Sequence, residues 1–389
     1  MPELRQRGTK QTTSTGSKTL VKSVKSSQRD DCDDSCKEGN SLVGNILKII
    51  FFIVTVPPML NYASLRQERD HLIKNTTLCD VGFGQKLHMS CRGEGRPTVV
   101  LESPAGLTSD VWLRAQSELV EVTRVCVYDR AGLGWSDPAP LLNMSDPGEA
   151  AVGRTLGPEA TVVRMSHDLH RLISLAHPQP RPLILVGAEL GALVTRVYTQ
   201  LHSQDVTHLV MIDPLSETVF DDVVSVDGRE ESAWLEHWYH TTQSWRLLQL
   251  AAMTGLTRLA LVTGLMNTGD QDNVRLKHHL CDPWHLQAVL DEHRSLNTSL
   301  GQVRELSSAW SLEESGVEST VISSSQYDHS LPAQVNRVWS RSVQELIERT
   351  GSRHLVISGA DRHLILTDLV SEITAPVLKI VKTWRQKNL

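Results

Sequence analysis

The chain has 389 residues, of which 40% are hydrophobic and 22% charged, and its formal net charge is -6. This length allows one large α/β domain with an appendage. The mild acidic excess argues against a nucleic-acid-binding surface, which needs clustered basic side chains. Because the sequence contains no Walker-type loop, no G-x-G-x-x-G and no paired C-x-x-C motif, it implies no metal or organic cofactor.

Residues 1–40 are rich in Ser, Thr, Lys and Asp and contain almost no large apolar side chains. Such a segment cannot bury enough surface to offset the loss of chain entropy on folding. We therefore predict a disordered tail. The tail carries many basic residues, followed by an acidic cluster, and the positive-inside rule predicts that this basic tail is cytosolic.

Residues 41–65 contain the most apolar run of the chain, with a strict core at 49–60 that ends near Pro57 and Pro58. A membrane span needs roughly 20 apolar residues, and this segment reaches that length if Lys48 snorkels toward the headgroups. No small-residue cleavage site follows the run. We predict a retained signal-anchor, a single transmembrane helix. The alternative is an amphipathic or hairpin segment docked on the domain.

Three Asn-x-Ser/Thr acceptor patterns begin at Asn75, Asn143 and Asn297. Used as glycosylation sites, they would make the chain a glycoprotein whose C-terminal domain is lumenal or extracellular, in the endoplasmic reticulum, the secretory pathway or at the cell surface. Cys79 and Cys91 flank a predicted hairpin and could form a disulfide in such a compartment. Cys126 lies in an apolar run and is predicted to be a buried free thiol.

From residue 77 to about 385, short apolar runs alternate with amphipathic segments, as in a mostly parallel sheet with helices on both faces. We expect strands at 85–91, 98–102, 124–128, 182–186, 208–212, 319–323 and 354–358, and helices at 111–122, 162–176 and 191–201. Residues 137–160 read as a long surface loop. Residues 215–315 interrupt the alternation and predict a helical cap. This cap contains Trp234, Trp238 and Trp245. Its tryptophan-rich composition implies an apolar pocket for a small-molecule or lipid ligand.

The segment 183–194 reads as a strand, a sharp turn and a helix. Gly187 and Gly191 flank Glu189 with one residue on each side, which is the spacing of the G-x-S-x-G nucleophile elbow. The glycines are needed because the central residue occupies a strained turn with no room for neighbouring side chains. Glu189 thus stands where a nucleophilic serine is expected.

The chain resembles the α/β-hydrolase superfamily, and most closely its members with an Asp-Arg-Ala-Gly-x-Gly-Trp-Ser segment. That segment is matched at 129–136, and further matches follow the expected order at 99–106, 209–214 and 353–364. Family members read Gly-His-Ser-Leu-Gly-Gly at the elbow, whereas this chain reads Gly-Ala-Glu-Leu-Gly-Ala at 187–192. Pro104 also replaces a glycine usual in the oxyanion loop.

The resemblance assigns triad positions and an oxyanion hole. The general base of the triad would be His363, which follows the last predicted strand. The acid would be Asp328, and Asp213 is the alternative. The oxyanion donors would be the backbone N–H groups of Ala105 and Leu190.

Three functions remain open. A pseudoenzyme or binding module is the first, because the hydroxyl required for acyl transfer is missing and the Glu189 carboxylate would occupy the oxyanion hole. A carboxylate nucleophile acting on epoxides or haloalkanes is the second, although glutamate is one methylene longer than the aspartate of such enzymes. Residual ester or lipid hydrolysis through a water activated by Glu189 and His363 is the third.

Overall fold

The computed structural model describes the backbone of residues 33–140, 160–221, 224–226, 229–266, 273–309, 312, 315–325, 328–329, 331–359 and 369–388. It divides into two units at 53/54. Most of the predicted loop 137–160, the acceptor Asn143 and the predicted base His363 lie outside these residues.

An eight-stranded sheet forms the centre of the second unit, with the strand order β1-β2-β4-β3-β5-β6-β9-β10. The first two pairings, β1–β2 and β2–β4, are antiparallel, and all others are parallel. The strands are β1 (Leu78–Asp80), β2 (Lys86–Arg92), β3 (Thr98–Glu102), β4 (Val125–Tyr128), β5 (Leu183–Ala188), β6 (Val206–Ile212), β9 (Glu318–Ser324) and β10 (Arg353–Ile357). The predicted architecture is thereby confirmed.

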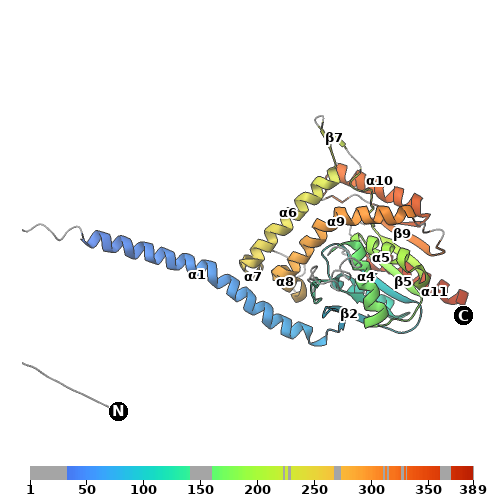
Figure 1. Ribbon diagram of the computed structural model, residues 1–389, viewed down its shortest axis with the longest axis horizontal. Coiled ribbons are helices and arrows are strands. Elements are labelled where there is room, and N and C mark those ends of the chain that lie inside the picture. The colour runs from blue at the N-terminus through green and yellow to red at the C-terminus, as the bar shows by residue number, and fades with distance from the viewer. Residues whose placement is uncertain are drawn as a thin grey trace, which may run out of the picture. The chain divides into compact units, whose positions relative to one another are not determined.

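Helices cover both faces of the sheet (Figure 1). The apolar residues of α4 (Val162–Arg171), α5 (Leu190–Leu201) and α10 (Ala333–Thr350) pack on one face, and those of α2 (Leu113–Leu119) and α11 (Val370–Asn388) on the other. β3 and β5 are buried along their whole length, which explains why their sequences are continuously apolar rather than alternating.

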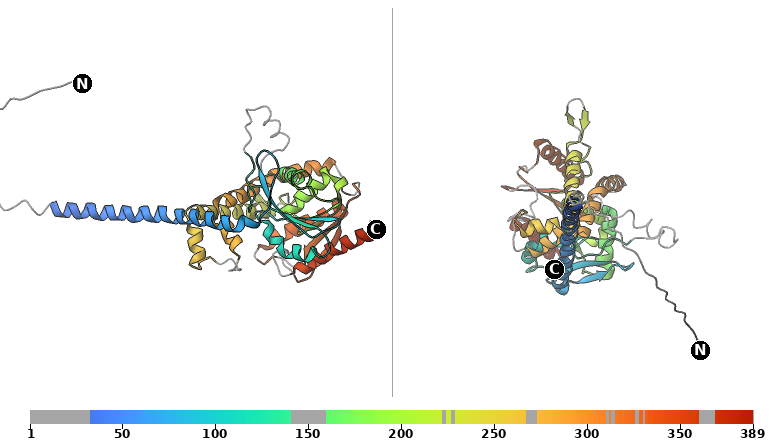
Figure 2. Two further views of the ribbon diagram at one scale, coloured as in Figure 1. Left: turned by 90° about the horizontal axis from the view of Figure 1, so that it is seen from below. Right: turned by 90° about the vertical axis from the view of Figure 1, so that its left-hand side faces the viewer.

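The helical insertion forms the predicted cap from α6 (Ala233–Met253), α7 (Leu256–Val262), α8 (Val274–Cys281) and α9 (Pro283–Ala309), after a small hairpin of β7 (Val224–Val226) and β8 (Arg229–Glu231). The α7 end of the cap lies across the domain from α11, as Figures 1 and 2 show. α9 returns along α6 and reaches α4 and α5, so it joins the cap to the core.

Helix α1 (Asp33–Leu72) is longer than the predicted anchor and continues through Pro57 and Pro58. It includes residues 33–40 of the segment predicted to be disordered, and residues 1–32 lie outside the description. By length and composition, its stretch Val43–Leu72 is apolar enough to cross a membrane. The part from Val54 onward belongs to the second unit, where buried Asn61 donates to the carbonyl oxygens of Ala252 and Cys281, at 3.0 Å each.

The disulfide considered possible between Cys79 and Cys91 does not form, and the prediction that Cys126 is a free thiol is wrong. Cys91 forms a disulfide with Cys126, and Cys79 is a buried free thiol. The reason is strand order: β2 pairs with β4 in a register that places Cys91 opposite Cys126, whereas Cys79 lies opposite Leu87. Cys126 is therefore buried, as expected, but it is not free.

Candidate active site

Glu189 lies at the turn between β5 and α5, with φ 51° and ψ -112°. This backbone conformation is strained for a residue with a side chain. A Cβ on Gly187 would lie 2.4 Å from the carbonyl oxygen of Gly191, and one on Gly191 would lie 2.6 Å from that of Glu102. The two glycines thus permit a close approach of backbone segments, as the sequence predicted.

Two backbone hydrogen bonds hold the elbow in place. The Glu189 N–H donates to the Ile212 carbonyl at 3.1 Å, and the Leu215 N–H donates to the Glu189 carbonyl at 3.2 Å. The strained turn is therefore fixed on the end of β6. Its conformation is set by the fold and does not require a serine side chain.

The predicted oxyanion donors, Ala105 and Leu190, come from neighbouring segments. β3 pairs with β5 so that Glu102 lies opposite Gly187, and this register brings the loop after β3 to the start of α5. Within the described part of the chain, neither the Ala105 N–H nor the Leu190 N–H makes a hydrogen bond. The roles of these two N–H groups as oxyanion donors stay predictions.

A buried ion-pair network that the sequence did not predict lies beneath the oxyanion loop. The Arg130 guanidinium contacts the Glu102 and Glu292 carboxylates at 2.6 Å each, and all three side chains are almost fully buried. Tyr128 donates its hydroxyl hydrogen to Glu102. Burial raises the pKa of Glu102, although Arg130 and the Tyr128 hydrogen bond act in the opposite direction.

The same network holds the oxyanion loop. Arg130 donates to the carbonyl oxygens of Ser103 and Pro104, each at 2.7 Å, and the Glu292 carboxylate accepts from the Gly106 N–H at 2.7 Å. The loop is thus bound on both sides of Ala105 by one buried pair. Arg130 belongs to the motif at 129–136, so that motif supports the site rather than entering it.

Asp129 has a comparable supporting function. Its carboxylate accepts from the Ser109 N–H at 2.7 Å and from the Trp135 N–H at 3.1 Å. A Cβ on Gly134, which has a φ of +56°, would lie 2.2 Å from this carboxylate. The motif therefore requires the aspartate and the glycine together.

The cap contributes His293, which sequence reasoning missed. Its ring is buried and stacks on Trp238, with the ring centroids 4.2 Å apart. Burial lowers the pKa of His293, while the carboxylates of Glu292 and Glu189 raise it. Its Nδ1 has no hydrogen-bond partner among the described residues. An imidazole other than His363 thus lies within electrostatic reach of Glu189.

The predicted acids lie on adjacent loops at the carboxyl edge of the sheet. Asp328 is buried after β9, where its N–H donates to the Asn336 side chain at 3.0 Å. Asp213 is buried directly after β6 and accepts from the Ser324 N–H at 3.1 Å. Asp213 also lines a cavity of about 210 Å³ with Trp339. The triad roles of Asp328 and His363 stay predictions.

The cap tryptophans do not share one environment. Trp234 is fully buried and packs against Trp339 of α10, so it belongs to the core rather than to a ligand entrance. Trp238 and Trp245 both contact the His293 ring. The apolar pocket under the cap stays a prediction, and Trp238 and Trp245 are the tryptophans that it would involve.

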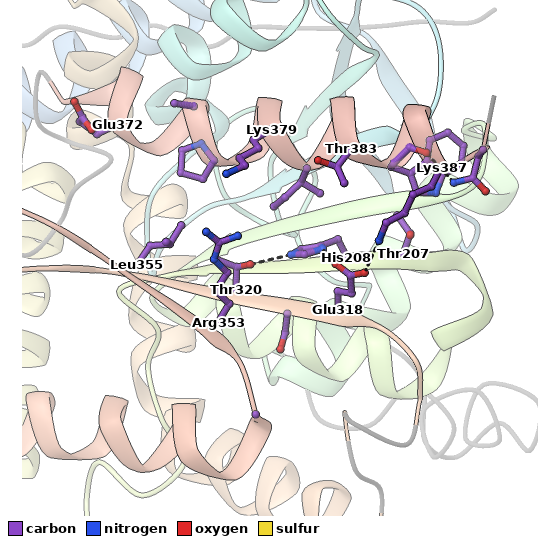
Figure 3. Close-up of a pocket in the computed structure, with 17 residues that line it drawn as sticks. Thr207, His208, Glu318, Thr320, Arg353, Leu355, Glu372, Lys379, Thr383 and Lys387 are labelled. Carbon is purple, nitrogen blue, oxygen red and sulfur yellow. Dashed lines mark hydrogen bonds and ion pairs between the residues drawn. The ribbon is translucent and has the colours of Figure 1, made fainter.

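A larger cavity, of about 840 Å³, lies between α11 and the beginnings of β6, β9 and β10 (Figure 3). Its walls include His208, Glu318 and Arg353, and burial lowers the pKa of His208 to about 4. These residues lie at the amino ends of parallel strands. Glu189 follows the carboxyl end of β5, so this cavity is on the opposite edge of the sheet from the elbow.

Comparison with known proteins agrees with this geometry. The sequence profile of the alpha/beta hydrolase fold family matches residues 97–369. An AB hydrolase superfamily protein of Gibberella zeae is 30% identical over 124 residues, which are 31% of this chain and 33% of that protein. The protein YqjL of Bacillus subtilis is 24% identical over 123 residues, 32% of this chain and 42% of YqjL. The chain thus matches less than half the length of these relatives.

Solved structures extend the likeness to most of the chain. The Cif epoxide hydrolase of Acinetobacter nosocomialis superposes with a TM-score of 0.55 at 14% identity, covering 82% of this chain and 95% of that one. An esterase of Exiguobacterium antarcticum superposes with a TM-score of 0.51 at 16% identity, covering 79% of this chain and 99% of the esterase. These likenesses concern the fold. With the matched profile, the parallel sheet and the strained elbow together, the chain belongs to the alpha/beta hydrolase fold family.

Proposed function

We propose that this protein is a membrane-anchored pseudoenzyme of the α/β-hydrolase fold, a binding module that has lost serine acyl transfer. The observation that carries the proposal is Glu189 at the elbow, in the strained conformation a nucleophile would occupy. A carboxylate there has no hydroxyl for a histidine to deprotonate. The N–H groups of Ala105 and Leu190 would stabilise that carboxylate rather than a reaction intermediate.

The ligand we propose is an apolar small molecule or lipid held beneath the cap, beside Trp238 and Trp245. Anchoring by α1 is supported by its apolar stretch Val43–Leu72. A lumenal or extracellular position of the C-terminal domain is supported by the Cys91–Cys126 disulfide, since such bonds persist in oxidising compartments. Exposed Asn297 on α9 is consistent with a glycoprotein.

The test is covalent labelling of the full chain with a fluorophosphonate probe. Wild type should stay unlabelled, whereas Glu189→Ser should become labelled, because in this proposal the serine would regain a His363 base and the N–H groups of Ala105 and Leu190 as oxyanion donors. Glu189→Gln is the matched control: it removes the charge, supplies no hydroxyl and should stay unlabelled. Labelling of a serine in wild type, or an inert Glu189→Ser, would contradict the proposal.

A second candidate is hydrolysis of an epoxide, haloalkane, ester or lipid with Glu189 as the reacting group and His363 as the base. The strained backbone at Glu189 favours this second function, because strained backbone conformations cluster at active sites. In the epoxide case a Glu189 oxygen would attack a ring carbon, the ring C–O bond would break, and the alkoxide would take a proton from water. A second water, deprotonated by His363, would then cleave the ester and release the diol and the Glu189 carboxylate. Turnover by wild type that disappears in Glu189→Gln would establish this function.

A further inference from the structure

The α7 end of the cap carries apolar side chains on its outside, a surface we name the cap apex. Each of its members is more than half exposed: Leu247, Leu250, Met253, Leu256, Leu259 and Val262. Exposing a leucine to water rather than burying it costs about 1.5–3 kcal/mol. A contiguous patch of this kind marks an interaction surface in a soluble environment.

Helix α7 has an inverted pattern. Leu256 and Leu259 face outward, while Thr257 is buried and Arg258 is turned toward α1. Arg258 is the one charged residue among the seven of α7, and it is bound to Glu68 at 2.5 Å and to Asn61 at 2.8 Å. A helix that hides its polar groups and presents leucines is adapted to an apolar surrounding.

The cap apex lies beside the apolar part of α1. A Cβ on Gly255, which precedes α7, would lie 2.4 Å from the carbonyl oxygen of Pro57, so the two backbones touch there. Around this contact, α1 exposes Met59, Leu60 and Tyr62. In Figure 2 the yellow α7 projects from the cap next to this part of α1.

Along α1 the polarity changes within a few residues of that contact. The apolar run ends at Leu60, and charged residues follow from Arg66 to Asp70. Glu68 lies eleven positions after Pro57, which corresponds to about 16 Å along a helix. The beginning of α7 is therefore level with the apolar part of α1, and the Arg258–Glu68 pair is level with its polar part.

We propose that the cap apex inserts into the lipid bilayer that holds α1, at the boundary between acyl chains and headgroups. The inference rests on the anchoring proposed above, because the apex gains a lipid surrounding only if the neighbouring apolar part of α1 has one. It adds a second, non-spanning membrane contact made by the folded domain itself. Lipid is favoured over a second copy of the chain because α7 begins at the contact with Pro57, close in sequence to the exposed α1 residues Met59, Leu60 and Tyr62.

Depth-dependent quenching tests the proposal on the full chain. The N-terminal segment 1–40 contains two further cysteines, Cys32 and Cys36, and both are replaced by serine. Cys79 and Cys281 then remain as buried free thiols. An NBD label is then attached at Val262→Cys, and the protein is reconstituted into phosphatidylcholine vesicles with or without doxyl-labelled lipid. Ile50→Cys in the candidate span and Glu348→Cys, exposed on α10, are the matched positive and negative positions.

We expect doxyl lipid to quench at least roughly half of the fluorescence at positions 262 and 50, and to leave position 348 essentially unquenched. Quenching at 50 alone would overturn the apex proposal and leave the anchor intact. An absence of quenching at all three positions would overturn both. A disulfide-linked dimer of unlabelled Val262→Cys, together with an unquenched label, would assign the apex to a second copy and so overturn lipid contact.

Discussion

Arg130 connects three separate parts of the molecule: the end of β3, the oxyanion loop and helix α9. A guanidinium suits this position because its planar set of donors can satisfy two carboxylates and two carbonyls simultaneously. The arrangement is buried, so each charge depends on its partners for stabilisation that water would otherwise provide. Positioning of the oxyanion loop therefore depends on a residue that lies outside the site.

The first residue-scale prediction concerns this network. Arg130→Met should lower the free energy of unfolding by about 3–5 kcal/mol, because Glu102 and Glu292 would lose their shared buried cation. The control is Arg294→Met, which breaks an exposed pair with Asp291 and should cost less than about 1 kcal/mol. Chemical denaturation measures both changes, and equal losses would show that the network is not what stabilises the loop.

The sequence predicted those site residues that form a motif within a short stretch of the chain. Gly187, Glu189 and Gly191 stand within five positions of one another, so their spacing alone identified the elbow. Glu292 and Arg130 are 162 positions apart and meet only through the tertiary fold. His293 lies in a cap helix whose periodicity does not distinguish it from the other histidines there, and its approach to Glu189 could not be read from the sequence.

At the scale of elements, prediction succeeded where burial determines the pattern and failed where pairing is non-local. β3 was predicted at its observed bounds because a strand buried on both faces is continuously apolar. The predicted helix 111–122 is instead a 3-10 segment, Ser109–Trp112, followed by α2. The disulfide depends on β2 lying beside β4, a neighbour that no local pattern indicates.

The element-scale prediction compares two glycines in helices. Gly191→Ala should destabilise the protein and disturb the elbow, because its Cβ would lie 2.6 Å from backbone oxygen of β3. Gly301→Ala in α9 has open space and should be neutral or stabilising by up to about 1 kcal/mol. Melting temperatures of the two variants provide the comparison. A tolerated Gly191→Ala would mean that α5 can move away from β3.

At the scale of the whole molecule, the disulfide joins strands 35 residues apart in sequence and fixes β2 to β4. Cys91→Ala should lower the free energy of unfolding by about 2–5 kcal/mol, because the unfolded chain regains the freedom that the bond removes. Cys79→Ala is the control, as it alters a buried cysteine without breaking a bond. Peptide mapping under non-reducing conditions should recover Cys91 linked to Cys126, and a Cys79–Cys91 peptide would refute the assignment.

Asn61 fastens the C-terminal part of α1 to the cap. Its amide binds carbonyls at the end of α6 and of α8, and the Glu68–Arg258 pair adds a second attachment two turns further along α1. The same helix leads through η1 (Ile73–Asn75) into β1. Residues 54–72 of α1 are therefore held to the cap at two points, so any cap shift that keeps these contacts would also pull on η1 and β1.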